Sequence, residues 1–149
     1  MGPKDFKPLR LMAADADDLQ VLSACLQDAV LKVGDLAYLP RERRFAFVAN
    51  RFLWEAAGAK DQGPFWRTRA GAHFDDVRAV RQLHIRAEAK DAVLEILAIG
   101  FEAGADGAGV VTVTFAGGGA IRLEVDAVNA ELRDIAEPWR TQSRPAHKD

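Results

Sequence analysis

The chain has 149 residues, of which 49% are hydrophobic and 28% are charged, with a formal net charge of −2. This length and balance predict one globular domain spanning residues 1–149. No apolar run approaches the roughly 20 residues that a transmembrane helix needs, which argues against a membrane-spanning protein. The isoelectric point near 5.9 argues against general binding of nucleic acid, because such binding depends on Lys and Arg neutralising phosphates.

Two local features bear on the cellular compartment. Cys25 is the single cysteine, so no internal disulfide can form, which fits a reducing compartment. Residues 1–5 lead directly into charged residues and lack the apolar segment of a secretory signal. We therefore expect a cytoplasmic protein.

The first predicted element is an amphipathic helix. It begins at residues 15–18, Asp-Ala-Asp-Asp, which are typical of a helix N-terminus because carboxylates cap the free N–H groups there. Apolar residues then recur at three-and-four spacing, at Leu19, Leu22, Leu26, Ala29 and Val30. Gly34 is predicted to end the helix, since glycine accepts the left-handed conformation common at helix C-termini.

A β-hairpin follows the helix in the prediction. Residues 36–39 form its first strand, residues 40–44 a charged turn and residues 45–54 a longer strand. Alternation places one set of side chains of the longer strand on a common face, namely Phe45, Phe47, Ala49, Arg51 and Leu53. Residues 58–64 then interrupt the pattern as a surface loop.

The second half of the chain is rich in predicted strands, at residues 65–69, 77–86, 93–101, 110–115 and 121–125. The connections are too short for crossover helices, so we expect an antiparallel meander. Residues 126–135 fit both a helical stripe and an alternating strand, and we favour the strand. After Pro138, residues 139–149 are expected to form a loosely held tail that Trp139 anchors.

Local motifs predict no metal site, cofactor or catalytic residue. The three histidines, His73, His84 and His147, lack metal-ligand spacing. Cys25 has apolar neighbours on the predicted helix and no local group that would favour its thiolate. The glycines at residues 117–119 precede an alternating strand instead of a helix, which indicates a hairpin turn and not a phosphate loop.

Arginines interleaved with aromatic residues are the one pattern that suggests a binding site. Guanidinium groups beside indole rings can hold phosphate or carboxylate groups. A structural alternative is that these arginines pair with Glu42, Glu55 or Asp61, while the tryptophans close the edge of the core. The candidate residues for binding an anion or a partner are Arg41, Arg43, Arg44, Arg51, Trp54, Trp66, Arg67 and Arg69.

Several segments resemble one known family. They are LQDAVLKVGD at residues 26–35, YLPRERRF at residues 38–45 and NRF at residues 50–52, followed by FDDV, TFAGG and PWRT at residues 74–77, 114–118 and 138–141. Together they resemble the bacterial family of domain of unknown function 2948 over essentially the whole chain. The resemblance implies a small, stand-alone bacterial protein. It carries over no activity, substrate or site residue.

These observations predict an α+β domain in which an N-terminal helix packs on a twisted antiparallel sheet, either as a sandwich or as an open barrel similar to pleckstrin-homology folds. We expect a non-catalytic binding or interaction protein with an arginine/tryptophan anion-binding surface. Its candidate partners are an anionic small molecule, another protein and a second copy of the chain. The alternative is a small enzyme whose site, drawn from His73, Asp75 or His84 beside an arginine, assembles only in the fold.

Overall fold

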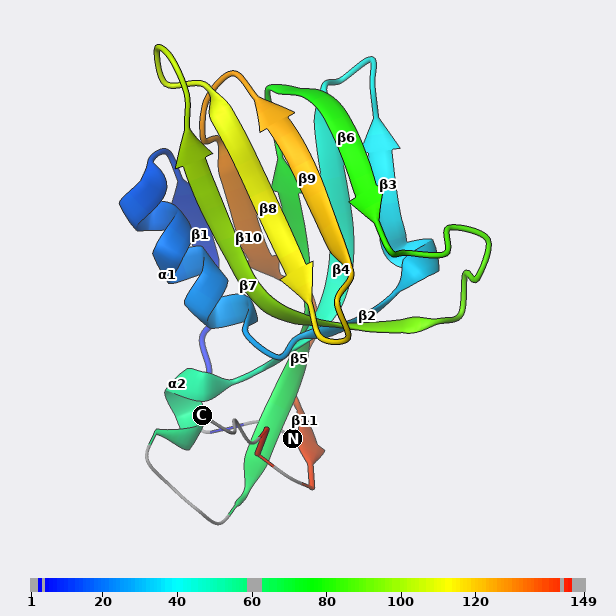
Figure 1. Cartoon of the computed structure of the whole chain (residues 1–149). Coiled ribbons are helices and arrows are strands. Elements are labelled where there is room, and N and C mark those ends of the chain that lie inside the picture. Colours follow the sequence, from blue (N-terminus) through cyan, green and yellow to red (C-terminus); the bar gives the residue numbers. More distant parts are fainter. Residues whose placement is uncertain (1–2, 4, 59–62, 143, 146–149) are drawn as a thin grey trace.

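The protein is an antiparallel sheet of eleven strands that folds into two layers (Figure 1). The computed structural model describes residue 3 and residues 5–58, 63–142 and 144–145. The first layer contains β1 (Arg10–Ala13), β10 (Ala130–Asp134), β5 (Phe65–Phe74) and β4 (Arg44–Phe52), with β3 (Leu36–Leu39) and β11 (Trp139–Thr141) paired to β4 and β5. The second layer contains β7 (Val93–Ala103), β8 (Gly109–Phe115), β9 (Ala120–Val125) and β6 (Val77–Leu83). The short strand β2 (Val30–Lys32) pairs with both β4 and β7 and so joins the layers.

The main hydrophobic core lies between the layers, because alternate side chains of the long strands face inward, and a smaller cluster of Phe52, Ala57 and Phe65 is separate from it. The buried side chains of both layers meet in the main core, among them Phe45, Phe47, Phe74, Ile99, Val113 and Leu123. The helix α1 (Ala16–Leu26) lies over the open side between β1 and β7 (Figure 1) and buries Leu19, Leu22 and Leu26. A helix on a mainly antiparallel sheet confirms the expected α+β class, with β1 preceding the helix along the chain.

The predicted start of the helix is confirmed. The side chain of Asp15 accepts a hydrogen bond from the Asp18 backbone N–H at 2.8 Å. The Asp18 carboxylate in turn accepts one from the Ala14 N–H at 3.0 Å. These two bonds satisfy N–H groups that the helix itself leaves free, which explains why residues 15–18 nucleate it.

The predicted end of the helix at Gly34 is wrong. The helix ends at Leu26, and Asp28 adopts a left-handed backbone conformation with φ of 66°. Asp28 donates its backbone N–H to the Ile96 carbonyl at 2.8 Å, so the chain enters the sheet directly after the helix. Gly34 lies in the 3₁₀ helix η1 (Val33–Asp35), where an added Cβ would stand 3.1 Å from the Lys90 carbonyl oxygen. That glycine permits a close backbone contact between segments remote in sequence.

The predicted hairpin at residues 36–54 is confirmed, with Leu36 opposite Phe47 and Leu39 opposite Arg44. Its second strand is shorter than expected. Trp54 begins a short helix, α2 (Trp54–Ala57), in place of continuing β4. The predicted loop at residues 58–64 falls partly on residues 59–62, which lie outside the described residues.

The strands predicted in the second half are also confirmed, but their spatial order is not a simple meander. β7, β8 and β9 follow one another as expected, whereas β6 pairs with β9. Residues 84–92 carry the chain from β6, at one edge of the second layer, to β7 at the other. The order therefore depends on a connection longer than a hairpin turn, which strand periodicity does not specify.

The C-terminal part contributes two strands to the first layer. Residues 126–135 contain the favoured strand, β10, which pairs with β1 and β5. β11 pairs with β5 through Trp139 opposite Arg67, and within the tail residues 143 and 146–149 lie outside the described residues. Among the residues that the structure describes, no helix is long and apolar enough to cross a membrane.

Replacing the capping residue by Asp15→Ala should lower the free energy of unfolding by about 1 kcal/mol, because the Asp18 N–H loses its acceptor. Urea denaturation followed by circular dichroism measures the change. Asp17→Ala is the matched control, since Asp17 lies in the same first turn and does not cap it. An equal loss in both variants would contradict the capping role.

Candidate binding groove

The predicted arginine/aromatic residues do not gather on one surface. β4 and β5 pair over most of their length, with Phe45 opposite Phe74 and Phe52 opposite Arg67. Arg44 therefore lies near one end of this strand pair and Arg67 near the other. Seven of the eight predicted residues divide into three groups with different surroundings, and the eighth, Arg69, lies on the outer face of β5.

The first group lies at the turn between β3 and β4. Arg43 forms an ion pair with Asp126. Arg44 binds Asp75 through two hydrogen bonds, of 2.7 and 3.2 Å. Arg41 is exposed, and no hydrogen bond or ion pair joins it to another described residue.

The second group is Arg51 alone, which is completely buried. Its Nε and Nη2 atoms donate to the Asp134 carboxylate at 2.7 and 2.9 Å, and the Asp134 side chain is itself fully buried. Its Nη1 and Nη2 atoms also donate to Glu55 at 3.1 and 2.7 Å. The pKa of Arg51 is raised, because these hydrogen bonds outweigh burial, which by itself would lower it. Arg51 is thus held inside the fold, in the pairing with Glu55 that the structural alternative expected.

The third group lies at the opposite end of β4 and β5. Trp54 donates its indole N–H to the Gln27 carbonyl at 3.0 Å, and its ring packs edge-on against Phe52. Arg67 donates to the carbonyls of Asp28 and Asn50 at 3.3 and 3.0 Å. Burial lowers the pKa of Arg67. Trp66 is half-buried on β5 beside it.

A groove of about 450 Å³ crosses the outer face of the first layer, over β3, β4, β5 and β10. Its floor consists of small side chains, those of Ala37, Ala46, Val48 and Gly71. Ala46 lies opposite Ala37 on one side and opposite His73 on the other, so the floor follows the cross-strand rows of the sheet. The floor is low because these outward positions carry short side chains, whereas His73, Glu131 and Arg133 in the same cross-strand rows carry long ones.

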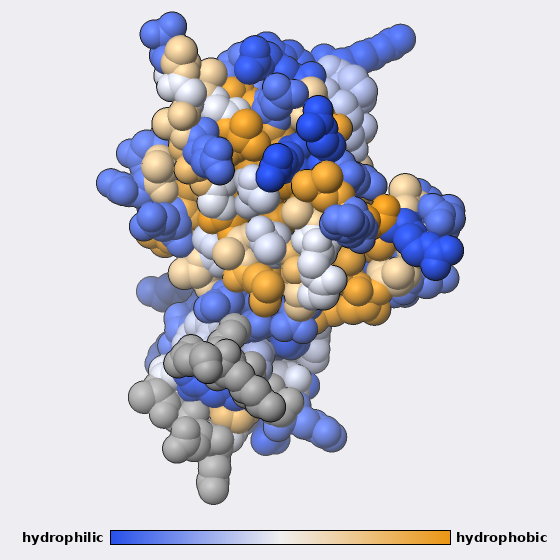
Figure 2. All heavy atoms as spheres, viewed as in Figure 1, coloured by the Kyte–Doolittle hydropathy of each residue, from blue (hydrophilic) through white to orange (hydrophobic). Residues whose placement is uncertain are grey.

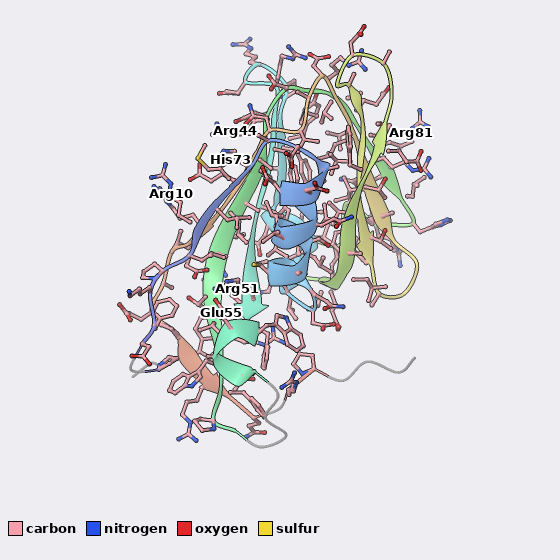
Figure 3. All side chains as sticks on the ribbon, turned by 90° about the vertical axis from the view of Figure 1, so that its left-hand side faces the viewer. Arg10, Arg44, Arg51, Glu55, His73 and Arg81 are labelled. Carbon is pink, nitrogen blue, oxygen red and sulfur yellow. The ribbon has the colours of Figure 1, made fainter. Side chains whose placement is uncertain are left out.

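Charged side chains border one part of the groove and pair with one another. His73 Nε2 lies 3.6 Å from Asp75 Oδ2 and 3.7 Å from Glu131 Oε1. Glu131 also accepts a hydrogen bond from Arg10 at 2.9 Å, which lowers the pKa of its carboxyl group. Arg10, Arg44 and His73 lie along the same outer face in Figure 3. Two of the three residues of the enzyme alternative, His73 and Asp75, are thus brought together, whereas His84 follows β6 in the second layer.

Two further arginines on this face form no ion pair with any described residue. Arg133 lines the groove and is exposed. Arg69 lies on the same face of β5, two residues before Gly71, and donates only to the Asn50 side-chain oxygen at 3.4 Å. Because Glu131 and Asp75 already bind arginines, Arg133 supplies the positive charge left for a ligand in the groove, which the Asp35 carboxylate also lines.

Sequence reasoning identified Arg44 and Arg69 but missed Gly71, Glu131 and Arg133. A glycine inside a strand pattern is a recognisable signal, since it often marks a site where another group approaches the backbone. The alternation of Glu131 and Arg133 on a strand is the second signal. It gains meaning only once β10 is known to pair with β5.

The described part of the chain contains no group of three or more His, Cys, Asp or Glu side chains placed to hold a metal ion. Cys25 is half-buried on α1, and burial raises the pKa of its thiol, which opposes formation of the thiolate.

Comparison with known proteins gives one match. The family model described as a protein of unknown function, DUF2948, matches residues 9–147. No curated protein and no solved structure matches the chain.

Asp134→Asn should lower the free energy of unfolding by about 3 kcal/mol, because the buried charge of Arg51 would keep only Glu55 as an anionic partner. Chemical denaturation measures the loss. Glu131→Gln is the control, since its ion pair with Arg10 is largely exposed and should contribute less than about 1 kcal/mol. Similar losses of unfolding free energy in the two variants would show that the buried Arg51–Asp134 pair stabilises the fold no more than an exposed pair does.

Proposed function

Because the chain belongs to DUF2948, a family whose description assigns no activity, we propose its function from the groove alone. The protein is a non-catalytic binding protein, and the groove takes up a segment of a partner protein that carries acidic and apolar side chains. The acidic side chains of the partner follow from Arg133, which lines the groove, and from Arg69, which lies two residues from Gly71 on the same face of β5. The apolar character follows from the floor of the groove.

Gly71 is the observation that carries the proposal. It lies in the interior of β5, between β4 and β10, and its φ is not positive. A Cβ added there would meet no atom within 4 Å. A residue with a Cβ would therefore be accommodated and would favour the strand, since glycine in an element interior costs roughly 0.5–1 kcal/mol. Gly71 thus lowers the stability of the strand and leaves open space above the sheet at this position.

The ends of the groove supply apolar contacts. Leu39 on β3 is 40% exposed, and Ile135 after β10 is 52% exposed. Both line the groove, at opposite ends of the strand row. Large exposed apolar side chains at the borders of a groove are typical of surfaces that bind another protein.

Arg69 and Arg133 give the surface its preference for acidic side chains of the partner. A guanidinium group holds a carboxylate through two parallel hydrogen bonds. Arg44 and Arg69 come from the surface expected from the sequence, whereas Trp54 and Trp66 lie at the far end of β4 and β5 and take no part in the proposal. A pleckstrin-homology-like barrel stays a prediction from the sequence, and the position of α1 over the open side of the sheet is the feature that favours it.

A small enzyme is the second candidate function, and one observation favours it. His73 lies beside two carboxylates at the groove, an arrangement that can transfer protons. The groove is shallow and open, however, which suits a protein segment better than a substrate that must be shielded from water. Hydrolysis of nitrophenyl esters or phosphates that disappears in His73→Gln would favour the enzyme.

The test fills the groove without removing a charge. Gly71→Val should have a melting temperature equal to or higher than that of the wild type, and it should bind peptides much more weakly. A library of random 12-residue peptides displayed on phage is selected on the wild-type protein. We expect enrichment of Asp and Glu together with Leu and Phe, and at least tenfold weaker binding of the selected peptides to Gly71→Val and to the double variant Arg69→Gln, Arg133→Gln.

Gly100→Val is the matched control, because Gly100 is a strand glycine of the second layer that also has open space above it. It should bind the selected peptides like the wild type. Equal affinity of the wild type and Gly71→Val would contradict the proposal. So would a concentration-dependent dimer in sedimentation that Gly71→Val abolishes, since the groove would then hold a second copy of the chain.

A further inference from the structure

A second hollow lies on the opposite side of the molecule, on the outer face of the second layer. It measures about 280 Å³ and lies over β6, β9 and β8. Arg81 of β6 stands directly opposite Arg122 of β9, and Arg122 in turn stands opposite Thr112 of β8. One cross-strand row thus presents two guanidinium groups and a hydroxyl group. Figure 2 shows strongly hydrophilic side chains over β9 and β6 on this face, and Figure 3 shows Arg81 on the layer opposite His73.

The placement of two arginines opposite each other is unfavourable for the sheet itself. Like charges on directly paired positions repel, and a carboxylate at either position would stabilise the pair. Neither Arg81 nor Arg122 forms an ion pair with a described residue. Six other arginines of the described chain are paired with carboxylates, namely Arg10, Arg43, Arg44, Arg51, Arg78 and Arg86, whereas Arg41, Arg69 and Arg133 are not.

Two acids line the same hollow one row away. Glu124 follows Arg122 by two residues on β9, and Glu102 projects from β7 in the same row as Glu124, with Val110 between them. Neither makes an ion pair with Arg81 or Arg122. The positively charged row of Arg81 and Arg122 is therefore bounded on one side by the carboxylates of Glu102 and Glu124. An extended polyanion would reach these carboxylates and be repelled, whereas a compact anion would contact only the arginines.

We propose that Arg81, Arg122 and Thr112 bind a phosphate group. Tetrahedral oxyanions match the forked N–H groups of arginine, and the threonine hydroxyl supplies a further donor. Glu102 and Glu124 accept hydrogen bonds from hydroxyl or amino groups in the rest of the phosphorylated molecule. The ligand class is therefore a small phosphorylated molecule with hydrogen-bond donors, and not a nucleic acid.

The experiment titrates the protein with inorganic phosphate and, separately, with glycerol 3-phosphate at constant ionic strength. Chemical shifts of the arginine Nε–H groups and of the Thr112 amide report binding. We expect saturable shifts at Arg81, Arg122 and Thr112 with both probes, and tighter binding of glycerol 3-phosphate, whose hydroxyl groups reach the two acids. Equal affinities for the two probes would mean that the site recognises only the phosphate group. They would overturn the proposed role of Glu102 and Glu124 as hydrogen-bond acceptors.

Arg81→Gln and Arg122→Gln should each weaken binding about tenfold, the effect of losing one charge-assisted contact pair. In phosphate-free buffer their melting temperatures should equal or exceed that of the wild type, because the repulsion is removed. The melting temperature thus distinguishes a variant that has lost a contact with the ligand from a variant that has lost its fold. Arg86→Gln is the control for net charge, since Arg86 pairs with Glu88 outside the hollow. Shifts that chloride reproduces, or that persist in both variants, would overturn the proposal.

Discussion

The buried ion pair between Arg51 and Asp134 is the constraint on which the first layer depends. A guanidinium group without solvent exposure is tolerable only if carboxylates hold it closely. Arg51 belongs to β4 and Asp134 to β10, and the two strands lie on either side of β5. Asp134 also accepts the Leu9 backbone N–H, and Arg51 holds Glu55 on α2. One buried charge thus fixes the relative position of three strands, the N-terminal segment and a short helix.

The same strands carry the groove on their other face, and this explains why the groove keeps its shape. In a strand, alternate residues point to opposite faces, so the register that pairs Arg51 with Asp134 inside also sets the outward rows of Ala46, Gly71 and Arg133. A shift of one residue would move these side chains into the core. The floor can therefore consist of small residues without collapsing, because the ion pair and the aromatic core beneath hold the backbone in place.

The arginines of the chain have three distinct uses, which composition alone does not separate. Some neutralise carboxylates at turns, as Arg44 does with Asp75. Arg51 is a structural group of the interior. Arg69, Arg133, Arg81 and Arg122 form no ion pair with a described residue, and they are the arginines that we propose to contact ligands. The strand spacing of Arg67 and Arg69 correctly indicated a shared face of β5, and Arg69 is the nearer of the two to Gly71 in the groove.

The sequence by itself determined the longer strands, the hairpin, the start of the helix and the α+β class, because these depend on alternation and capping within a few residues; the short strands β1, β2 and β11 were not predicted. It did not determine the end of the helix or the order of the strands. At Asp28 the left-handed turn and the pairing with Ile96 outweighed the apolar spacing of Ala29 and Val30. The groove likewise arose only in three dimensions, since Gly71 and Arg133 are more than 60 residues apart and meet through the pairing of β5 with β10. Local periodicity fixes which face a side chain takes, and only long-range pairing decides what stands beside it.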